Sequence, residues 1–552
     1  MSTDDVRERA EAWLADDPDP VARAEIRALL DGLPGSAGEL ADRFAGPLTF
    51  GTAGLRGRLR AGPNGMNLAV VTRAAAGLVG WLSGTGADGP LVIGYDARHG
   101  SRAFAERTAE VAQGAGRAAL LLPRPLPTPV LAYAVRALDA VAGVMVTASH
   151  NPPQDNGYKV YLGAGLGGTS GAGAQIVPPA DVEIEAAIQA VDKLAAVELG
   201  GPGRVLGEEI IDGYVHRAAA TLPAGPRALT VAYTPLHGVG GDVLAAAFER
   251  AGFPAPHVVA EQALPDPDFP TVAFPNPEEK GAMDRLLALA TATGADLAIA
   301  NDPDADRCAV AVPGPDGSWT PLTGDQLGAA LADQLIRRGA PGTYATTIVS
   351  SSLLRAICAA RGVPYGETLT GFKWIVRADD DLAYGYEEAL GYCVAPGLVR
   401  DKDGITAALL VAELAAGLKA EGRTLADRLA ELDVEFGVHR TDQLSVRVDD
   451  LADIGRAMSH LRGAPPATLL GEPMTFEDLR PENDILRLST ASARVVIRPS
   501  GTEPKLKAYL EVVRPATAAT LTGDRAAASE AVAALKDETA KALGLIPHSG
   551  TV

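Results

Sequence analysis

Three aspartates alternate with other residues in the segment 301–307, between two apolar runs. In an extended chain alternate side chains point the same way, so Asp302, Asp304 and Asp306 are expected to converge on one point. Three carboxylates that close repel one another unless a cation lies among them, and all-oxygen ligands suit Mg²⁺ better than zinc. An EF-hand is excluded, because its sixth and twelfth positions need glycine and glutamate, where this chain has arginine and proline. The segment predicts a magnesium site, with a simple acidic turn as the alternative.

A serine lies between a strand-like run and a double proline. Ser149 and His150 follow the apolar residues 142–147, at the carboxyl end of a strand, where open α/β sheets usually build their sites. The prolines block helical continuation, and Gly157 is expected to permit the turn into a second strand, 158–162. Ser149 is therefore expected at a rigid loop tip. Taken alone, the segment is equally consistent with a nucleophile and with a turn cap.

A cluster of cations and hydroxyls follows another strand-like run near the C-terminus. The segment Arg498–Lys505 combines a guanidinium, two hydroxyls, a glycine and an ammonium group. Arginine can bind two phosphate oxygens at once, and lysine adds a point charge. The segment predicts a phosphate anchor, with a polar hairpin and its ion pair as the alternative. The expected anchor residues are Arg498, Ser500, Gly501, Thr502 and Lys505.

Residues 163–168 match the dinucleotide signature G-x-G-x-x-G after a strand, but no dinucleotide is expected there. The following residues, 169–179, are rich in glycine, serine and proline, and are not expected to open the helix that the signature requires. A flexible surface loop is predicted instead.

Composition and charge exclude several classes of function. The 552 residues, 47% of them hydrophobic, predict a globular protein of three or four domains. A net charge of −20 provides no field that gathers nucleic acid or an anionic membrane. The three cysteines show no C-x-x-C spacing, which argues against a disulfide framework or a zinc site and favours a reducing compartment. With no apolar leader and no run of eighteen apolar residues, the expected localisation is cytoplasmic, without nucleic-acid or membrane partners.

The elements that must position these loops alternate between helix and strand. Such alternation begins near residue 68 and restarts near residues 227 and 324, which predicts α/β layers with mostly parallel sheets. From Gly437 onward strands come first and a helix ends the chain. The predicted fold class is α/β, with three consecutive similar α/β domains and a smaller C-terminal α+β domain around a central cleft. The predicted boundaries are 1–45 for a helical N-terminal extension, 46–208, 209–322 and 323–436 for the α/β domains, and 437–552 for the last domain.

The three loops together resemble those of the α-D-phosphohexomutase superfamily, the phosphoglucomutases and phosphomannomutases. Thr147–Pro152 resembles its phosphoserine loop, Asp302–Arg307 its magnesium loop and Arg498–Lys505 its phosphate-binding loop. The resemblance runs from about residue 45 to the C-terminus. The order and spacing of the motifs across four domains argue against coincidence. The four predicted domains would then carry, in order, the phosphoserine, the metal, the sugar and the second phosphate.

Further segments extend the resemblance and narrow it to one branch. Phe50–Gly57 resembles the opening loop, Thr370–Trp374 with Gly385–Tyr392 the sugar-recognition region, and Val399–Gly404 the segment after it. Many members have a serine directly after the glutamate pair, whereas this chain has Ala389. This departure resembles the branch that includes phosphopentomutase-type enzymes and bacterial phosphoglucomutases.

The resemblance implies a magnesium-dependent isomerase that moves a phosphoryl group between the 1- and 6-positions of a hexose. The implied route uses an enzyme phosphoserine and a bisphosphorylated intermediate. Phosphoglucomutase is the first expectation, and phosphomannomutase and phosphopentomutase are the alternatives. A metal-dependent phosphosugar phosphatase and a non-catalytic phosphosugar sensor are alternatives from other classes. The implied cofactors are Mg²⁺ and glucose 1,6-bisphosphate as intermediate and activator, and the implied partner is a small phosphosugar. The sequence carries no signal for an oligomeric state.

The resemblance also implies roles for single residues. The implied metal ligands are Ser149, through its phosphate, and Asp302, Asp304 and Asp306. The implied catalytic residues are Ser149, His150, Lys159 and Lys402. Either lysine is a candidate for the general base or for a plain phosphate contact. The implied substrate-binding residues, besides the anchor, are Arg56, Arg307, Lys373, Glu387 and Glu388.

Overall fold

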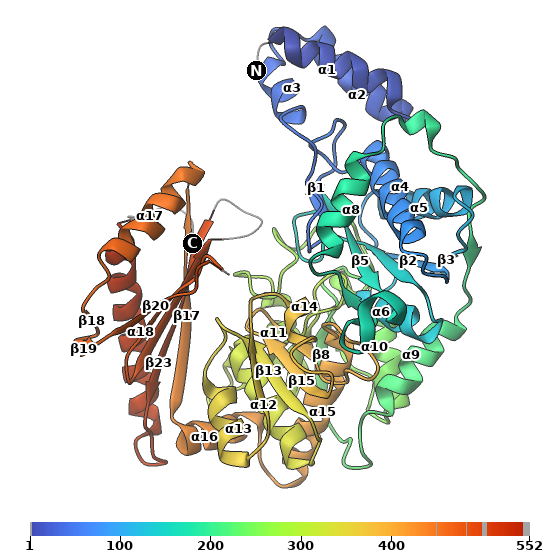
Figure 1. The fold of residues 1–552 in the computed structure, drawn as a ribbon. Coiled ribbons are helices and arrows are strands. Elements are labelled where there is room, and N and C mark those ends of the chain that lie inside the picture. Colours follow the sequence, from blue (N-terminus) through green and yellow to red (C-terminus); the bar gives the residue numbers. More distant parts are fainter. Residues whose placement is uncertain (1–2, 449, 482, 500–504, 545–552) are drawn as a thin grey trace.

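The structure is a computed structural model that describes residues 3–448, 450–481, 483–499 and 505–544. Three α/β layers follow a helical N-terminal segment and precede an antiparallel α+β unit (Figure 1). This arrangement confirms the predicted fold class. None of the described helices has the length and apolar character that crossing a bilayer requires.

The N-terminal segment forms three helices that pack around a small core. Their bounds are α1 (Thr3–Asp16), α2 (Pro20–Asp31) and α3 (Ala37–Arg43). The Asp19 carboxylate accepts a hydrogen bond from the Val21 amide and caps α2, with Pro20 at the first helical position. Ile26, Leu40 and Phe44 are buried between the helices. The segment from Thr3 to Arg43 is thus largely helical.

The first layer is a mixed sheet in the order β1-β5-β4-β2-β3-β7, with β6 paired to β5. Its strands are β1 (Leu55–Arg58), β2 (Leu91–Tyr95), β3 (Ala119–Leu121), β4 (Ala142–Val146), β5 (Asp155–Leu162), β6 (Ala174–Gln175) and β7 (Arg204–Val205). Its helices are α4 (Leu68–Gly84), α5 (Ser101–Gly114), α6 (Thr128–Ala137), α7 (Ala164–Gly171) and α8 (Ala180–Gln189), with a 3₁₀ turn at Leu194–Ala196. Helix α9 (Glu209–Ala219) follows and packs against α10 (Gly241–Arg250) of the second layer.

The second and third layers repeat the plan with fewer strands. The second sheet has the order β12-β11-β10-β8-β9 and the third the order β14-β13-β15-β16. The second layer contains β8 (Val231–Thr234), β9 (His257–Val258), β10 (Leu297–Ala300), β11 (Ala309–Pro313), β12 (Trp319–Pro321), α10 (Gly241–Arg250), α11 (Asp284–Thr293) and a 3₁₀ turn at Ala260–Gln262. The third contains β13 (Thr343–Thr347), β14 (Tyr365–Thr368), β15 (Leu382–Glu387), β16 (Gly391–Cys393), α12 (Gly324–Arg337), α13 (Leu353–Arg361), α14 (Phe372–Ile375), α15 (Gly404–Ala420) and α16 (Leu425–Phe436).

Each of the three sheets joins parallel strands to an antiparallel strand through one hairpin. These hairpins connect β4 to β5, β10 to β11 and β15 to β16. The expectation of mostly parallel sheets therefore holds for the centre and one edge of each sheet, while the other edge is antiparallel. The same three hairpins carry the serine, the aspartates and the glutamate pair singled out in the sequence.

The C-terminal unit is an antiparallel sheet in the order β17-β23-β22-β21-β20. Its elements are β17 (Val438–Arg447), α17 (Leu451–Gly463), β18 (Thr468–Leu469), β19 (Glu472–Pro473), β20 (Thr475–Asp478), β21 (Leu486–Ser489), β22 (Ala493–Pro499), β23 (Lys505–Arg514) and α18 (Leu521–Leu543). It has its own apolar core, whereas one continuous core runs through parts of all three α/β layers. In Figure 1 this orange-to-red unit stands beside the third layer, with which it is in contact through α16.

Two local expectations are wrong. Residues 163–168 are not a flexible loop, because α7 forms there, packs against β5 and β6, and is broken only at Gly168, where φ is 65°. Gly157 is not a turn residue, because β5 begins at Asp155. A Cβ atom at Gly157 would lie 2.5 Å from the Thr147 carbonyl oxygen and 2.9 Å from that of Leu55. The glycine is required by close strand packing.

Candidate active site

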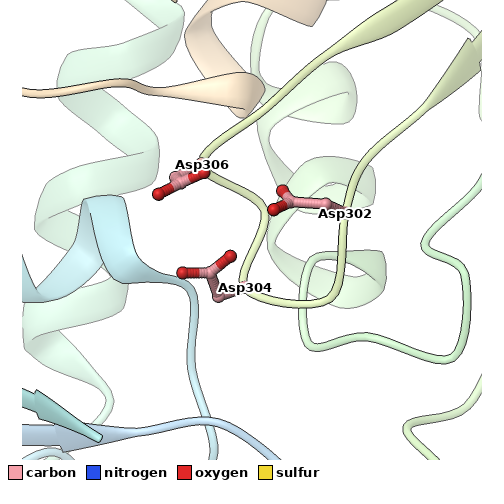
Figure 2. A group of neighbouring side chains, drawn as sticks. All are labelled: Asp302, Asp304 and Asp306. Carbon is pink, nitrogen blue, oxygen red and sulfur yellow. The ribbon is translucent and has the colours of Figure 1, made fainter. Parts of the chain in front are cut away.

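The three aspartates lie on the loop between β10 and β11 and are fully buried. They do not converge through an extended chain, as expected from the sequence, but through a tight turn. The Ala305 amide donates to the Asp302 carbonyl at 2.9 Å, and Ala305 adopts a left-handed φ of 53°. One carboxylate oxygen from each aspartate lies within 4.8 Å of the other two. Figure 2 shows the three carboxylates around a common space.

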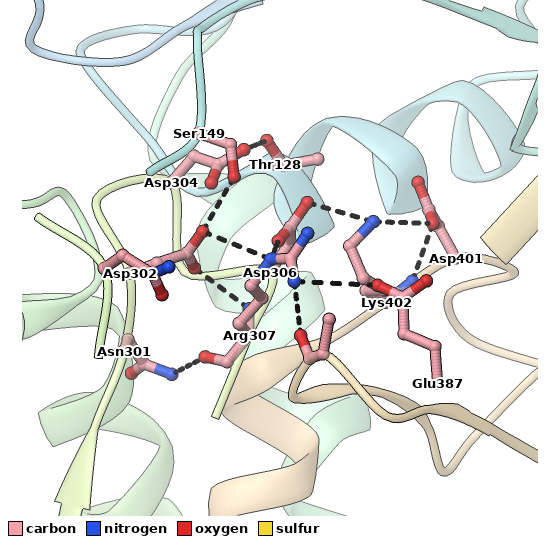
Figure 3. Close-up of polar contacts among 12 residues, drawn as sticks. Thr128, Ser149, Asn301, Asp302, Asp304, Asp306, Arg307, Glu387, Asp401 and Lys402 are labelled. Atoms are coloured by element: carbon pink, nitrogen blue, oxygen red, sulfur yellow. Dashed lines mark hydrogen bonds and ion pairs between the residues drawn. The ribbon is translucent and has the colours of Figure 1, made fainter. Parts of the chain in front are cut away.

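Cations from two other layers and from the loop itself surround this aspartate cluster. The Lys159 ammonium, on β5, lies 2.8 Å from Asp304 Oδ2 and 3.2 Å from Asp306 Oδ2. The Lys402 ammonium, in the turn before α15, lies 3.3 Å from Asp306 Oδ2. The Arg307 Nε lies 3.9 Å from Asp302 Oδ2 and 3.7 Å from Asp306 Oδ1 (Figure 3). The aspartates and the cations around them are therefore brought together where the three layers meet.

The pKa values follow from burial and from these neighbours. Burial, together with repulsion from Asp304 and Asp306, raises the pKa of Asp302 well above its usual range. Burial acts in the same direction on Asp304, but the Lys159 ammonium outweighs it and the pKa of Asp304 is lowered. For Lys159, burial is outweighed by Asp304 and Asp306, which raise the pKa of the amine. In this arrangement Lys159 is held as an ammonium ion.

The aspartate cluster fits a hard divalent cation. Oδ1 of Asp304 and Oδ1 of Asp306 are buried and accept no hydrogen bond from the described part of the chain. A buried oxygen without a donor is costly, and it becomes favourable as a metal ligand. The donor set consists of oxygen atoms alone, which suits Mg²⁺ rather than zinc. Asp302, Asp304 and Asp306 are the residues that would hold the ion.

Ser149 faces the aspartate cluster from the carboxyl end of β4. Its hydroxyl donates to Asp302 Oδ2 at 2.8 Å, and the side chain is buried. Its φ of 51° is left-handed, which is uncommon outside glycine and often found at functional sites. The Ser149 amide donates to Thr147 Oγ1 at 2.9 Å. Thr147 is thus the turn cap, and the Ser149 hydroxyl is left to face the carboxylates.

Arg98, which the sequence reasoning missed, holds the serine loop in place. Its guanidinium donates to four carbonyl oxygens, those of Ser149 (2.6 Å), Asn151 (2.5 Å), Pro152 (2.8 Å) and Asp155 (3.2 Å). The side chain is fully buried, and its guanidinium carbon lies 5.0 Å from the centroid of the Phe269 ring in the second layer. A signal was available, because Arg98 follows β2, the parallel neighbour of β4, at the same edge of the sheet.

Thr128 also supports the site without having been expected there. It opens α6, and its hydroxyl donates to Asp304 Oδ2 at 2.7 Å while its amide donates to the Asp304 carbonyl at 2.9 Å. These two bonds tie the aspartate loop of the second layer to a helix of the first. A single threonine at a helix start carries no sequence signal for such a contact.

His150 and Arg56 lie on the first-layer side of the site. His150 is half-buried, and burial together with the charges of Arg307 and Arg56 holds its pKa well below the usual range. The imidazole is therefore neutral. Arg56, on β1, donates to the Asn151 Oδ1 of the serine loop at 3.1 Å. Both residues lie near the predicted nucleophile, and neither contacts the three aspartates through a hydrogen bond.

The two glutamates at the end of β15 have different partners. Glu387 is buried, and its Oε1 lies 3.7 Å from the Arg307 guanidinium. Burial raises the pKa of Glu387 to about 7, although Arg307 opposes the shift. Glu388 Oε2 accepts hydrogen bonds from the hydroxyls of Thr347 (3.1 Å) and Ser350 (3.0 Å). Glu387 faces the aspartate cluster, and Glu388 faces the end of β13.

The remaining predicted residues lie on the third layer and on the C-terminal sheet. Lys373, on α14, donates to the Thr52 hydroxyl in the opening loop of the first layer. Arg498 lies on β22, and Tyr509 on the adjacent β23; burial and the charge of Glu388 raise the pKa of Tyr509, while the charge of Arg498 opposes the shift. Lys505 begins β23. Three predicted anchor residues, Ser500, Gly501 and Thr502, lie outside the described residues.

Profiles of a known family match four consecutive parts of the chain. They describe the phosphoglucomutase/phosphomannomutase alpha/beta/alpha domains I, II and III, which match residues 47–195, 212–315 and 323–434, and the C-terminal domain, which matches residues 444–541. The matches occur in the order of the four units described above and together span most of the chain.

Individual relatives carry three different substrate names. A probable phosphomannomutase of Haemophilus influenzae is 47% identical over 459 residues, covering 81% of this chain and 93% of the relative. A phosphopentomutase of Mus musculus is 32% identical and covers 91% and 89%. A phosphoglucomutase of Staphylococcus aureus is 31% identical and covers 86% and 92%. The crystal structure of a putative phosphomannomutase from Thermus thermophilus, 26% identical, superposes with a TM-score of 0.71 and covers 90% of this chain and 99% of that one.

Proposed function

Because the chain belongs to the phosphoglucomutase/phosphomannomutase family of the α-D-phosphohexomutase superfamily, we propose that it is a magnesium-dependent phosphoglucomutase that interconverts glucose 1-phosphate and glucose 6-phosphate. Membership implies an isomerase that transfers a phosphoryl group within a phosphosugar. The single observation that carries the proposal is the Ser149 hydroxyl, held 2.8 Å from Asp302 within a buried cluster of carboxylates.

In the proposed reaction Ser149 carries a phosphoryl group in the resting enzyme. A hydroxyl oxygen of the sugar phosphate attacks the phosphorus atom, the bond between phosphorus and Ser149 Oγ breaks, and the sugar becomes a bisphosphate. The attacking hydroxyl loses its proton to a base. The bisphosphate turns end for end, Ser149 Oγ attacks the phosphorus atom of its other phosphate, and the bond between that phosphorus and the sugar oxygen breaks. The sugar oxygen takes up a proton, the isomeric monophosphate leaves, and Ser149 carries a phosphoryl group again. The turned intermediate is glucose 1,6-bisphosphate, which also supplies phosphate to an enzyme that has lost it.

Magnesium, held by Asp302, Asp304 and Asp306, would offset the negative charge of the phosphoryl group. The chain's own cations surround the same point, because Arg307, Lys159 and Lys402 all lie within 4 Å of a carboxylate of the cluster. The base is proposed to be Lys159 or Lys402. For either lysine this role requires release from its present ion pair, since both amines are held protonated by the aspartates.

The other end of the substrate is proposed to rest on the C-terminal unit. Arg498 and Lys505 lie on adjacent strands, and with Ser500, Gly501 and Thr502 they would bind the phosphate that is not being transferred. Glu387 and Glu388 would accept hydrogen bonds from the sugar hydroxyls. A phosphatase would use the same serine and metal but has no need of this second anchor. Arg498 therefore favours a mutase over a phosphatase.

The choice of glucose rests on the resemblance to the branch that includes bacterial phosphoglucomutases. Two carboxylates do not by themselves report the configuration at C2 or the size of the sugar ring. The relatives include a probable phosphomannomutase and a phosphopentomutase as well as a phosphoglucomutase, so mannose and pentose phosphates are the alternative substrates.

The test is to incubate the protein with Mg²⁺, a trace of glucose 1,6-bisphosphate and one sugar 1-phosphate, and to follow the phosphorus NMR signals. We expect glucose 6-phosphate from α-glucose 1-phosphate. Faster isomerisation of mannose 1-phosphate or ribose 1-phosphate would transfer the proposal to that sugar. Release of inorganic phosphate without any isomer would overturn the mutase in favour of a phosphatase.

A further inference from the structure

A buried carboxylate joins the C-terminal sheet to the third layer. Glu511, on β23, has 3% of its side chain exposed. Its Oε1 accepts hydrogen bonds from the Ser351 hydroxyl (2.7 Å), the Ser352 amide (2.8 Å) and His439 Nδ1 (3.0 Å). Ser351 and Ser352 belong to the third layer, just after β13. The Glu511 carboxylate of the C-terminal unit therefore accepts hydrogen bonds from two serines of the third layer.

Arg494 completes this contact from the neighbouring strand, β22. Its guanidinium lies 2.9 Å from Glu511 Oε2. It also donates to the carbonyl oxygens of Ile348 and Ser350 in the third layer. Although burial opposes it, the hydrogen bond from His439 and the charge of Arg494 lower the pKa of Glu511 to about 2. The Glu511 carboxylate is thus ionised and pairs with Arg494, and each of these two side chains also hydrogen-bonds the third layer.

The segment that Glu511 and Arg494 hold, residues 347–352, is the same segment that holds Glu388. The hydroxyls of Thr347 and Ser350 donate to Glu388 Oε2, and the two hydroxyls lie 2.8 Å apart. Arg494 binds the carbonyl of Ser350, whose side chain binds Glu388. Only one residue therefore separates the ion pair of the C-terminal unit from the Glu388 carboxylate.

The ion pair and the phosphate anchor share one face of the C-terminal sheet. Alternate residues of a strand point the same way, so Arg494, Val496 and Arg498 of β22 lie on one face. Val495 and Ile497, on the opposite face, are buried in the core of the C-terminal unit. On the shared face Val496 and Tyr509 pack against Ile348 and Val349 of the third layer. The anchor and the Glu388 support are therefore parts of one surface.

We propose that Glu511 and Arg494 are positioning residues that fix the Glu388 carboxylate through the segment 347–352, so that docking of the C-terminal unit sets the sugar-binding geometry. The proposal rests on the proposed function, which assigns Glu388 to the sugar hydroxyls. It adds that the phosphate anchor and the sugar carboxylate are coupled, because the ion pair that supports Glu388 lies on the same face of the sheet as Arg498.

The test compares steady-state kinetics of the full chain and of the double variant Glu511→Gln with Arg494→Gln, with Mg²⁺ and glucose 1-phosphate. Neutralising both partners leaves no unpaired buried charge, so the fold is expected to survive. We expect a roughly fivefold rise in KM with a smaller change in kcat, the size expected for one lost hydrogen bond. In a Glu388→Ala background the same double change should leave KM unaltered. An unchanged KM in the first case, or an equal rise in both backgrounds, would overturn the proposal.

A matched control lies at the same junction. Arg525, on α18, pairs with Asp433 of α16 at 2.6 Å, away from the segment 347–352. Arg525→Gln breaks an ion pair between the same two units and should leave KM unchanged; an equal rise in KM would show general loosening and overturn the proposal. If the wild-type protein isomerises no phosphosugar, the proposed function is wrong, and the coupling between the C-terminal unit and Glu388 is tested separately. Hydrogen exchange then reads the coupling: faster exchange at the Ser350 and Ser352 amides in the double variant supports it, and unchanged exchange overturns it.

Discussion

Ser149 and Asp302 share a hydrogen bond that joins two loops 153 residues apart in the sequence. The bond places the Ser149 hydroxyl against Asp302 Oδ2, and the other oxygen of that carboxylate accepts a hydrogen bond from the Arg307 amide at 3.0 Å. Each side chain is therefore held by a partner from the main chain or from another loop. At the scale of the residue, the site is defined by such fixed pairs.

Replacing Ser149 by alanine tests the nucleophile directly. Without the hydroxyl no phosphoserine can form, so Ser149→Ala should lose both turnover and the singly phosphorylated species in the intact mass spectrum. Ser83→Ala, an exposed serine on α4, is the control and should keep both. A fully active Ser149→Ala variant would remove this serine from the mechanism.

The aspartate cluster predicts a stability that depends on the metal. A ligand that binds only the folded state raises the midpoint of thermal unfolding as its concentration increases. Titration with MgCl₂ should raise the midpoint of the wild-type protein. Asp306→Asn should abolish most of this rise, because one of the three converging carboxylates is lost. Asp88→Asn, an exposed aspartate before β2, should respond as the wild type does. Equal shifts in all three proteins would argue against binding at the cluster.

Arg98 predicts a large kinetic effect from a conservative change. A lysine cannot span the four carbonyl oxygens that the guanidinium binds, so Arg98→Lys should let the serine loop shift. A displacement of this kind is expected to reduce kcat roughly 100-fold while the circular dichroism spectrum stays unchanged. Arg102→Lys is the control, since Arg102 is exposed on α5 and pairs with Glu106 of the same helix. Equal activity in both variants would contradict the role.

At the scale of the element, one hairpin is used three times. In each layer the connection from a parallel strand to its antiparallel neighbour carries predicted site residues, which are Ser149, the aspartates or the glutamate pair. The hairpin loops lie at the carboxyl ends of the parallel strands, where site residues are expected. The antiparallel strand then returns the chain into the sheet, and this fixes the loop at both ends.

A buried acid at the start of α12 predicts a pH dependence of stability. Burial raises the pKa of Asp325 to about 7, while hydrogen bonds from the Ser351 amide and the Tyr386 hydroxyl oppose the shift. At pH values between 3.8, the ordinary pKa of an aspartate, and about 7, Asp325 is protonated in the folded state but not in the unfolded state. The free energy of unfolding should therefore fall as the pH rises through this window.

Asp325→Asn checks this prediction, because the amide keeps the Oδ1 acceptor for both donors. Between pH 5 and pH 8 the thermal midpoint of the variant should decline less than that of the wild type. The difference between the two midpoints should therefore shift in favour of the variant as the pH approaches 8. Asp212→Asn is the control, since Asp212 also lies in the first turn of a helix but is exposed. Parallel pH profiles for Asp325→Asn and the wild type would refute the assignment.

Several elements and motifs were predictable from local sequence alone. The alternation of helix and strand expected from about residue 68 is formed by α4, β2, α5 and β3, and the aspartate loop was identified because its residues lie in one short segment. The way the aspartates converge was not predictable, because it depends on a left-handed Ala305. Arg98 escaped notice because its partners are main-chain carbonyls, which leave no trace in residue type. The ion pair of Lys159 with Asp304 depends on packing between two layers, which spacing along the chain does not report.

At the scale of the whole molecule, the C-terminal unit has an apolar core separate from the one that the three α/β layers share. One apolar core runs through parts of the three α/β layers, and a second belongs to the C-terminal sheet and its helices. The units meet through a small apolar contact and through the ion pairs around Glu511 and Arg494. Separate cores connected in this way favour separate cooperative unfolding.

Calorimetry should therefore show two transitions, and core substitutions should move them separately. Leu488 is buried in the C-terminal core and Leu409 in the core of the α/β layers. Each change to alanine is expected to cost about 2–5 kcal/mol in its own unit. Leu488→Ala should lower one transition and Leu409→Ala the other. A single transition that both variants lower equally would contradict two independent cores.

The hydrogen bonds from Arg98 to the serine loop also affect how a newly synthesised chain becomes active. Ser149 is buried, its hydroxyl is engaged by Asp302, and its own carbonyl is bound by Arg98. A protein kinase would have to unfold this loop to receive the serine. Under the proposed mechanism, the first phosphate would therefore come from a sugar bisphosphate. A fresh molecule would start work only after one already phosphorylated intermediate has primed it, which ties the onset of activity to the metabolite pool rather than to a signalling protein.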